Sequence, residues 1–412
     1  MRLPAGRLPR VNDQLSSILR SVGLKTARQN FTYTSSGQVR AGENLYAILQ
    51  APRGDATEAI ALVAGWVNAE GERNANGVAL ALTLARYFRR WSLWSKDIVF
   101  LFPPDSLAGP QAWVDAYHDA HGITVAPLPL KPGALQGAVA IDYAQEHRFE
   151  SVHIAYDGVN GMLPNLDLVN SVVSIAGGHM GINVAIQENW AGGDAYPDRL
   201  RTMLRGMLKQ GLGLASGPHS AFMAYHVDAV TLRPFGDGWQ DEMAMGRVIE
   251  GTFRSLNNLL EHLHQSFFFY LLIARERFVS IGTYLPSAMV VAANFTITAI
   301  ALWVRSGQAA DKVGKVDKAA AAASPAVERD LFLPLGVVAA CQFLGVVPLY
   351  LFNHLPASVS RWPPWLSRSH DHAFRLSPCM RKCSPKRTSS SPPPLLSLPP
   401  LTPSSRTPHR HC

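Results

Sequence analysis

Two side chains could bind a metal ion or transfer a proton, one at the end of a segment with the composition of a buried strand and one on a later loop. Asp142 ends the apolar run Gln136–Asp142, and His219 lies in the segment GPHSAF. Carboxylate and imidazole groups at the carboxyl ends of neighbouring strands are typical of metal and acid–base sites in α/β proteins. The comparable positions after the other expected strands carry an indole, amides or prolines: Trp66, Asn68, Asn74, Pro103 and Pro104.

The order of these positions resembles the ligand pattern of the zinc exopeptidases. In that family a His-x-Asp, a bridging Asp that opens a helix, a Glu pair, a further Asp and a late His hold two ions. Only Asp142 and His219 keep ligand chemistry in this pattern, because Trp66, Asn68, Asn74 and the two prolines replace the rest. Zinc needs anionic or imidazole ligands. We therefore expect no metal, no cofactor and no catalysis, and hydrogen-bonded remnants at Asp142 and His219.

Other catalytic and binding signatures are not found in the sequence. No cysteine precedes Cys341, which excludes a disulfide framework or a cysteine zinc site in the long N-terminal part. There is no G-x-S-x-G elbow and no phosphate-binding loop. The formal net charge is +8, but much of the excess lies in the C-terminal tail, so we expect no nucleic-acid binding.

The order of the expected elements favours an α/β fold with a mixed sheet flanked by helices. Helices are expected at Asp13–Val22, with Asp13 as N-cap, at Asn76–Phe88 and at Gly109–Tyr117. The expected strands are Leu45–Leu49, Ala59–Trp66, Asp97–Phe102, Gln136–Asp142 and Val152–Tyr156.

A long amphipathic helix is expected from Glu242 to Leu272, since apolar residues recur there at intervals of three and four. Its end, HQSFFFYLL, is rich in aromatic rings, which suit a membrane–water interface. An ordinary core-facing stripe is the alternative. The side chains expected at the interface are His264, Phe267, Phe268, Phe269 and Tyr270.

Two apolar runs follow that are long enough to cross a bilayer. We expect transmembrane helices at 278–304 and 331–355, joined by a polar connector at 305–330. Residues 356–412 form a Pro-, Ser- and Arg-rich tail that we expect to be disordered and not to be the usual end of such a protein. The N-terminus has no apolar core of signal-peptide length, so we expect an upstream anchor to be missing.

Several blocks closely resemble the GPI-anchor attachment protein family, a subunit of GPI transamidase. They keep their order and cover residues 40–290. The blocks are NLYAILQAPRG from Asn44, WSKDIVFLF from Trp94, WVDAYHD from Trp113, DGVNGMLPNLDLVN from Asp157, LNNLLEHLHQSFFFYLL from Leu256 and RFVSIGTYLP from Arg277.

The resemblance implies a zinc-aminopeptidase-like luminal domain, here residues 1–277, in the endoplasmic reticulum membrane. It implies a non-catalytic subunit that helps present the GPI lipid and hold the complex, while a caspase-like subunit carries out the chemistry on precursors with C-terminal GPI signals. The sequon at Asn30 would then be a glycosylation candidate. Two alternatives remain: a metallo-enzyme that itself forms the amide bond, using Asp142 and His219, and a binding ectodomain similar to that of the transferrin receptor.

Overall fold

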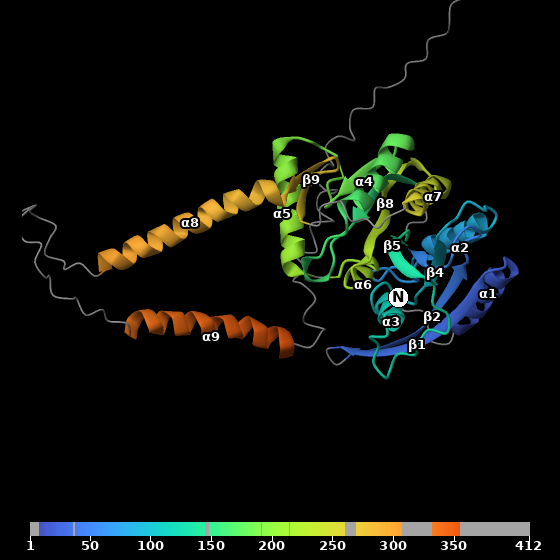
Figure 1. Ribbon diagram of the computed structural model, residues 1–412, viewed down its shortest axis with the longest axis horizontal. Helices are drawn as coiled ribbons and strands as arrows, with labels where there is room; N and C mark the ends of the chain where they lie inside the picture. Colours follow the sequence, from blue (N-terminus) through green and yellow to red (C-terminus); the bar gives the residue numbers. More distant parts are fainter. Residues whose placement is uncertain are drawn as a thin grey trace, which may run out of the picture. The chain divides into compact units, whose positions relative to one another are not determined.

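The centre of the protein is an eight-stranded mixed sheet with the order β1-β2-β4-β3-β5-β8-β6-β7 (Figure 1). The computed structural model describes residues 8–35, 38–144, 148–190, 192–213, 215–259, 269–306 and 332–354. The α/β fold with a mixed sheet is confirmed. The strands are β1 (Lys25–Ser35), β2 (Gln38–Leu49), β3 (Glu58–Val63), β4 (Asp97–Phe102), β5 (Ala134–Ile141), β6 (Phe149–Ala155), β7 (Asn183–Ile186) and β8 (Asp228–Gln240).

The middle of the sheet is parallel. Strand β3 pairs in parallel with β4 and β5, and β5 pairs in parallel with β8. Strands β1, β2 and β4 are joined by antiparallel pairing, as are β6 and β8, while β6 and β7 are parallel. Parallel strands are covered on both faces and so become continuously apolar, as in DIVFLF of β4, where every residue is buried. The carboxyl ends of β3, β4 and β5 therefore meet at one edge.

Helices cover both faces of this sheet. One hydrophobic cluster packs α1 (Leu8–Ser21), α2 (Ala75–Arg89), α4 (Leu166–Val173) and α7 (Glu242–Asn258) against one face. A second cluster packs α3 (Ala108–Tyr117) and α6 (His219–Met223) against the other. Short helical turns η1 (Val159–Gly161) and η2 (Ser174–His179) and the longer helix α5 (Tyr196–Leu212) complete the described part of the domain.

The expected start of the first helix is wrong. Helix α1 begins at Leu8, so Asp13 lies within it and is not an N-cap. The Asp13 carboxylate instead accepts a hydrogen bond from Arg28 on β1 at 2.7 Å. Strand β1 itself was not predicted, because its polar residues give no apolar run, and it is specified by its full-length antiparallel pairing with β2.

The helix expected over Glu242–Leu272 is also wrong at its end. Helix α7 stops at Asn258, and Tyr270–Leu272 belong to strand β9 (Tyr270–Ala274), which pairs with β10 (Arg277–Ser280). Tyr270 is only 2% exposed, and its hydroxyl donates a hydrogen bond to the Pro164 carbonyl at 2.8 Å. It is thus a core residue rather than a membrane-interface one.

Of the other four residues expected at the membrane interface, the structure describes one. His264, Phe267 and Phe268 lie outside the described residues. Phe269 is described, and the residue is 66% exposed.

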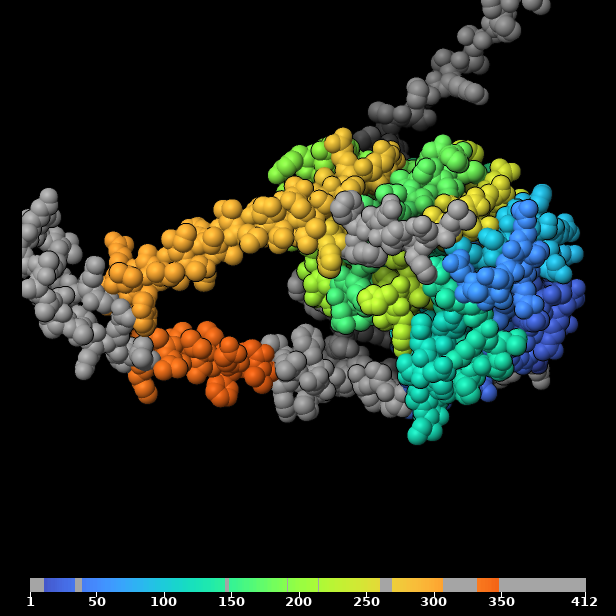
Figure 2. All heavy atoms as spheres, in the orientation of Figure 1, coloured from blue at the N-terminus to red at the C-terminus, as the bar shows by residue number. Residues whose placement is uncertain are grey.

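The first apolar run forms helix α8 (Ile281–Ser306), which is long and apolar enough to cross a membrane. The run was expected to be helical from Phe278, but Phe278–Ser280 are in β10, and the helix continues through Arg305. Figure 2 shows α8 in orange with its side chains uncovered along most of its length. Helix α9 (Phe332–His354) contains the shorter apolar stretch Phe332–Val347. Residues 307–331 and 355–412 lie outside the described residues.

Candidate functional site

The side chain of Asn74 forms hydrogen bonds with four backbone groups at the edge of the sheet where the zinc exopeptidase pattern places its ligands. It is the N-cap of α2, and its side-chain oxygen accepts hydrogen bonds from the backbone N–H groups of Gly77 and Tyr143, at 3.2 and 2.8 Å. Its amide nitrogen donates to the carbonyls of Gly65 and Ile141, at 3.0 and 2.8 Å. An aspartate could not make the two donated bonds. The amide therefore suits a structural junction rather than a bridging ligand.

Trp66 and Asn68 shape the loop between β3 and α2. The backbone N–H of Trp66 donates to the Pro103 carbonyl at 2.9 Å, which joins this loop to the end of β4. The side-chain oxygen of Asn68 accepts hydrogen bonds from the backbone N–H groups of Glu70 and Glu72, at 3.1 and 2.8 Å. Both residues thus act in local structure. The indole nitrogen of Trp66 is buried and has no acceptor among the described residues.

Asp142 is paired with a cation that belongs to the protein. Its side chain is 5% exposed, and its Oδ2 lies 2.8 Å from Nε of Arg233, on β8. Arg233 also reaches Glu70, at 2.8 Å, and the carbonyl of Ser216, at 3.5 Å. Burial raises the pKa of Asp142, while the charge of Arg233 and a hydrogen bond from Asn68 oppose the rise. The guanidinium group thus provides the positive charge that a metal would supply.

His219 is the first residue of α6, and both of its ring nitrogens are in use. Nε2 lies 3.0 Å from the Asp157 carbonyl, which can only accept, so Nε2 carries the proton. Nδ1 then accepts from the Thr231 hydroxyl at 2.6 Å. Burial lowers the pKa of His219 to about 4; the hydrogen bond to the Asp157 backbone opposes this fall, and the charge of Arg233 adds to it. The ring is therefore neutral at neutral pH, and its one lone pair is occupied.

These contacts do not fit a bound divalent ion. The two residues that keep ligand chemistry are joined through protein groups: Asp142 contacts Arg233, Arg233 contacts Ser216, and the Ser216 hydroxyl lies 3.2 Å from Nε2 of His219. Among the described residues, no group of three or more His, Cys, Asp and Glu side chains is placed to hold a metal. A catalytic ion needs several such ligands and an open position.

Arg233 is the central residue that sequence reasoning missed. Its only signal is a charge inside the apolar strand sequence DAVTLRPF. A charge in such a strand is stable only when it is paired, which points to a buried carboxylate nearby. Asp142 could be named as that partner only once β8 was known to lie beside β5.

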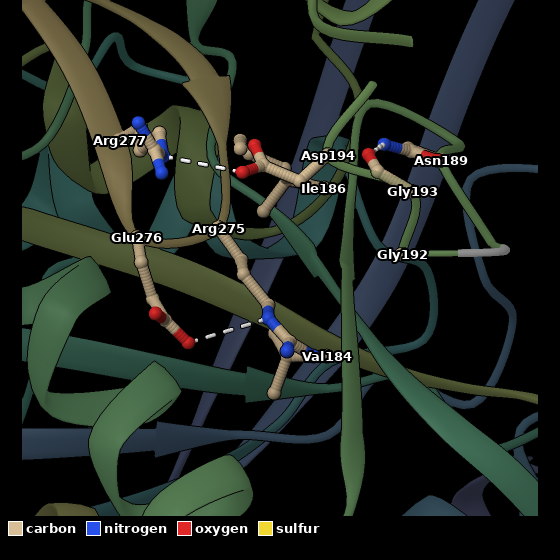
Figure 3. A pocket seen from close by; sticks show the side chains of 10 residues that line it. Val184, Ile186, Asn189, Gly192, Gly193, Asp194, Arg275, Glu276 and Arg277 are labelled. Atoms are coloured by element: carbon tan, nitrogen blue, oxygen red, sulfur yellow. Dashed lines mark hydrogen bonds and ion pairs between the residues drawn. The ribbon is translucent and has the colours of Figure 1, made fainter.

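Two other polar features lie away from this cluster. Asn30 is exposed on β1, where a glycan could be attached. A small cavity of about 140 Å³ lies between β7, the loop before α5 and the turn between β9 and β10, and Figure 3 shows the side chains that line it. Its two arginines are already paired, Arg277 with Asp194 at 3.3 Å and Arg275 with Glu276 at 3.4 Å. The cavity is smaller than typical ligand sites and its charges are matched within the protein, so it fits a polar contact between these segments rather than a ligand site.

The amino-acid sequence matches the model of a known protein family. The family model described as "Gaa1-like, GPI transamidase component" matches residues 41–382. The chain belongs to this Gaa1-like family. The family expected from the sequence blocks is thereby confirmed.

Two curated relatives agree with the family match. The chain is 38% identical over 303 residues to the GPI transamidase component gaa1 of Schizosaccharomyces pombe, covering 71% of this chain and 52% of the relative. It is 40% identical over 305 residues to GAA1 of Saccharomyces cerevisiae, covering 72% and 47%. The Gaa1-like chain thus spans about half the length of the curated relatives that it matches.

Solved structures with similar folds include zinc-dependent exopeptidases and glutaminyl cyclases. An exopeptidase from Parabacteroides distasonis is 12% identical, with a TM-score of 0.36, covering 61% of this chain and 90% of that one. A glutaminyl cyclase from Macrostomum lignano is 16% identical, with a TM-score of 0.40, covering 63% and 86%.

Proposed function

We propose that this Gaa1-like chain is a non-catalytic subunit of GPI transamidase that helps present the GPI lipid and hold the complex together. The family match over residues 41–382 carries the proposal. Both curated relatives are named as components of GPI transamidase. The partners are then the other subunits, among them a caspase-like catalytic one, the GPI lipid, and precursors with a C-terminal GPI signal.

The proposed location is the endoplasmic reticulum membrane, with the mixed-sheet domain in the lumen. Helix α8 supports a membrane location by its length and composition. The sequence after it supports the orientation, because segment 305–330 carries five basic residues that favour the cytoplasmic side. They are Arg305, Lys312, Lys315, Lys318 and Arg329.

A non-catalytic role is supported by the chemistry of the old ligand positions. The Nδ1 lone pair of His219 is taken by Thr231, and the carboxylate of Asp142 is held by Arg233. Neither group is poised to activate water or an amine, which a metal-dependent amide synthesis would require. The metallo-enzyme alternative therefore has no supporting contact at these positions.

The test is complementation in cells that lack the endogenous attachment subunit. The tagged chain is expressed, and the surface level of a GPI-anchored protein is measured together with co-purification of the caspase-like subunit. Rescue with co-purification is the expected result. Co-purification without rescue would keep the assembly role and remove lipid presentation, and the absence of both would overturn the proposal.

Variants at Asp142 and His219 and a metal measurement address catalysis, and a triple phenylalanine variant addresses the membrane interface. Asp142→Asn removes the only carboxylate left from the ligand pattern, and rescue is expected to stay at the level of the unchanged chain. Replacing Phe267, Phe268 and Phe269 by serine is expected to impair rescue, since exposed rings such as that of Phe269 suit an interface. A stoichiometric zinc that is lost in His219→Ala, together with loss of rescue in Asp142→Asn, would restore the enzyme reading.

A further inference from the structure

A large cavity lies at the edge of the sheet opposite Asn74 and Asp142. Its volume is about 870 Å³, within the usual range of small-molecule sites. It is lined by residues at the amino ends of two neighbouring parallel strands, Gln136 on β5 and Asp228 on β8. Because Asp142 follows the carboxyl end of β5, this cavity is separate from the old ligand positions.

The lining of the cavity is mainly apolar and adaptable. Three methionines contribute to it, Met162 after η1, Met207 on α5 and Met223 at the end of α6, together with Leu271 of β9. Unbranched thioether side chains can fit ligands of irregular or variable shape. The Asp228 carboxylate is already engaged, since it accepts a hydrogen bond from the backbone N–H of Asn165 at 2.8 Å. The lining therefore suits a flexible hydrocarbon rather than a polar or rigid ligand.

The cavity lies next to the first turn of the apolar helix α8. Tyr284, in the first turn of α8, lines the cavity together with Phe269. The backbone N–H of Ile281 donates to the Phe269 carbonyl at 3.1 Å, and Ser280 pairs with Tyr270 across the hairpin. If α8 crosses the membrane, its first turn lies at the bilayer surface. The cavity then lies within reach of lipid.

Helix α5 adds an exposed apolar surface beside the cavity. Tyr196, Leu200, Leu204 and Leu208 are spaced four apart and are between 38% and 78% exposed. The same helix has the sequence YPDRLRTMLRGMLKQGL, in which four basic residues accompany one acidic residue. Helices with exposed leucines and basic side chains are typical of membrane surfaces. Met207, three residues after Leu204 on the same helix, lines the cavity, so this surface and the cavity lining share helix α5.

We propose that this cavity receives one hydrocarbon chain of a membrane lipid that enters beside the first turn of α8. The choice of lipid rests on the proposed function, which makes it the phosphatidylinositol part of a GPI glycolipid. The Met-rich lining provides the apolar contacts, and each methylene group removed from water adds to the binding. The cavity would hold the lipid end of the anchor while its glycan remains in the lumen.

The test is photolabelling of the full chain in nanodiscs. One sample contains phosphatidylinositol with a diazirine in its acyl chain, and another contains phosphatidylcholine with the same labelled chain. Crosslinked residues are mapped by mass spectrometry. Labelling of the cavity residues Met207, Leu271 or Tyr284 is expected, stronger with phosphatidylinositol. Equal labelling by both lipids would support a chain site but overturn the choice of lipid.

A matched pair of variants separates the cavity from the helix surface. Met207→Glu places a charge in the lining and is expected to lower cavity labelling about tenfold, equivalent to losing roughly two methylene contacts. Leu208→Glu is the control, because Leu208 is similarly exposed, 59% against 48%, but does not line the cavity. The uncharged variant Met207→Gln, together with its thermal unfolding, shows whether a loss of labelling comes from misfolding. Equal losses in both glutamate variants, or labelling confined to α8, would overturn the proposal.

The outcomes remain distinct from those of complementation. Rescue in cells with no cavity labelling would leave the subunit role in place and remove the lipid site. Cavity labelling without rescue would keep the site and remove the role. A photoreactive apolar peptide that labels the cavity and displaces the lipid probe would show that the occupant is a polypeptide tail, contrary to this inference.

Discussion

Removing the guanidinium group of Arg233 should leave a buried carboxylate without its counter-charge. Asp142 is 5% exposed and lies 2.8 Å from Nε of Arg233, whose own side chain is 24% exposed. Arg233→Met keeps most of the alkyl stem and deletes the charge. Breaking a fully buried pair costs about 3–5 kcal/mol, and water around the partly exposed arginine reduces this, so we expect a loss of about 2–3 kcal/mol.

The size of this loss should depend on pH. Burial raises the pKa of Asp142, and without Arg233 the pKa should rise further. A carboxyl with a higher pKa in the folded state binds more protons there than in the unfolded state. Its contribution to stability is therefore lost as pH rises from its ordinary pKa of about 3.9 through the raised value. The difference between variant and parent should be larger at pH 7.5 than at pH 5.

The assay is thermal unfolding of the full chain in detergent at these two pH values. A loss of 2–3 kcal/mol corresponds to a decrease in Tm of roughly 5–10 °C for a domain of this size. The double variant Asp142→Asn with Arg233→Met is the control, since a neutral amide needs no counter-charge and should recover most of the loss. A single variant as stable as the parent at both pH values, or a double variant no more stable than the single, would refute the reasoning.

Three further predictions concern single residues. Asn74→Asp removes the two hydrogen bonds that the Asn74 amide donates to the Gly65 and Ile141 carbonyls, so chemical unfolding should show a loss of about 2–4 kcal/mol in the free energy of unfolding. Asn74→Gly, which removes the whole side chain, is the comparison. An unchanged unfolding midpoint in Asn74→Asp would contradict the junction role. Because burial lowers the pKa of His219 to about 4, the unfolded state binds more protons below pH 6.5, and stability should fall as pH falls from 6.5 to 4. His219→Gln should flatten that slope, and an unaltered slope would show that another group titrates. If the domain is luminal, glycosidase treatment should increase the gel mobility of the parent chain but not that of Asn30→Gln. The same mobility of the parent chain before and after treatment would mean that Asn30 carries no glycan.

The central strands could be read from the sequence because they are short, continuously apolar and buried on both faces. This holds for β3, which ends at Val63, and for β4, which ends directly before Pro103. The fold class follows from such segments, and the family follows from the sequence blocks and their order. Strand β1 escaped prediction, and β2 was predicted only at Leu45–Leu49, since the rest of this hairpin is partly polar and its pairing supplies the stability.

Strand β9 shows why local spacing was misleading. The apolar residues before it recur at intervals of three and four, which extends the helix pattern of α7 through Tyr270. The strand conformation is decided by pairing with the following strand β10 and by a hydrogen bond to the distant Pro164 carbonyl. The candidate site has the same limitation. Its positions could be located from the strand ends, but the pairing of Asp142 with Arg233 depends on a long crossover.

The place of β8 in the sheet has a consequence for folding during synthesis. Strand β8 (Asp228–Gln240) lies between β5 and β6, although β6 and β7 precede it in the chain. Until residue 240 has left the ribosome, strands β1–β5 and strands β6–β7 have no strand to join them, and each group presents an unpaired edge. Ribosome-arrested chains that end before Asp228 should therefore be cut readily by protease. Passage through Gln240 should bring protection in one step, with the two halves of the sheet becoming a single cooperative unit.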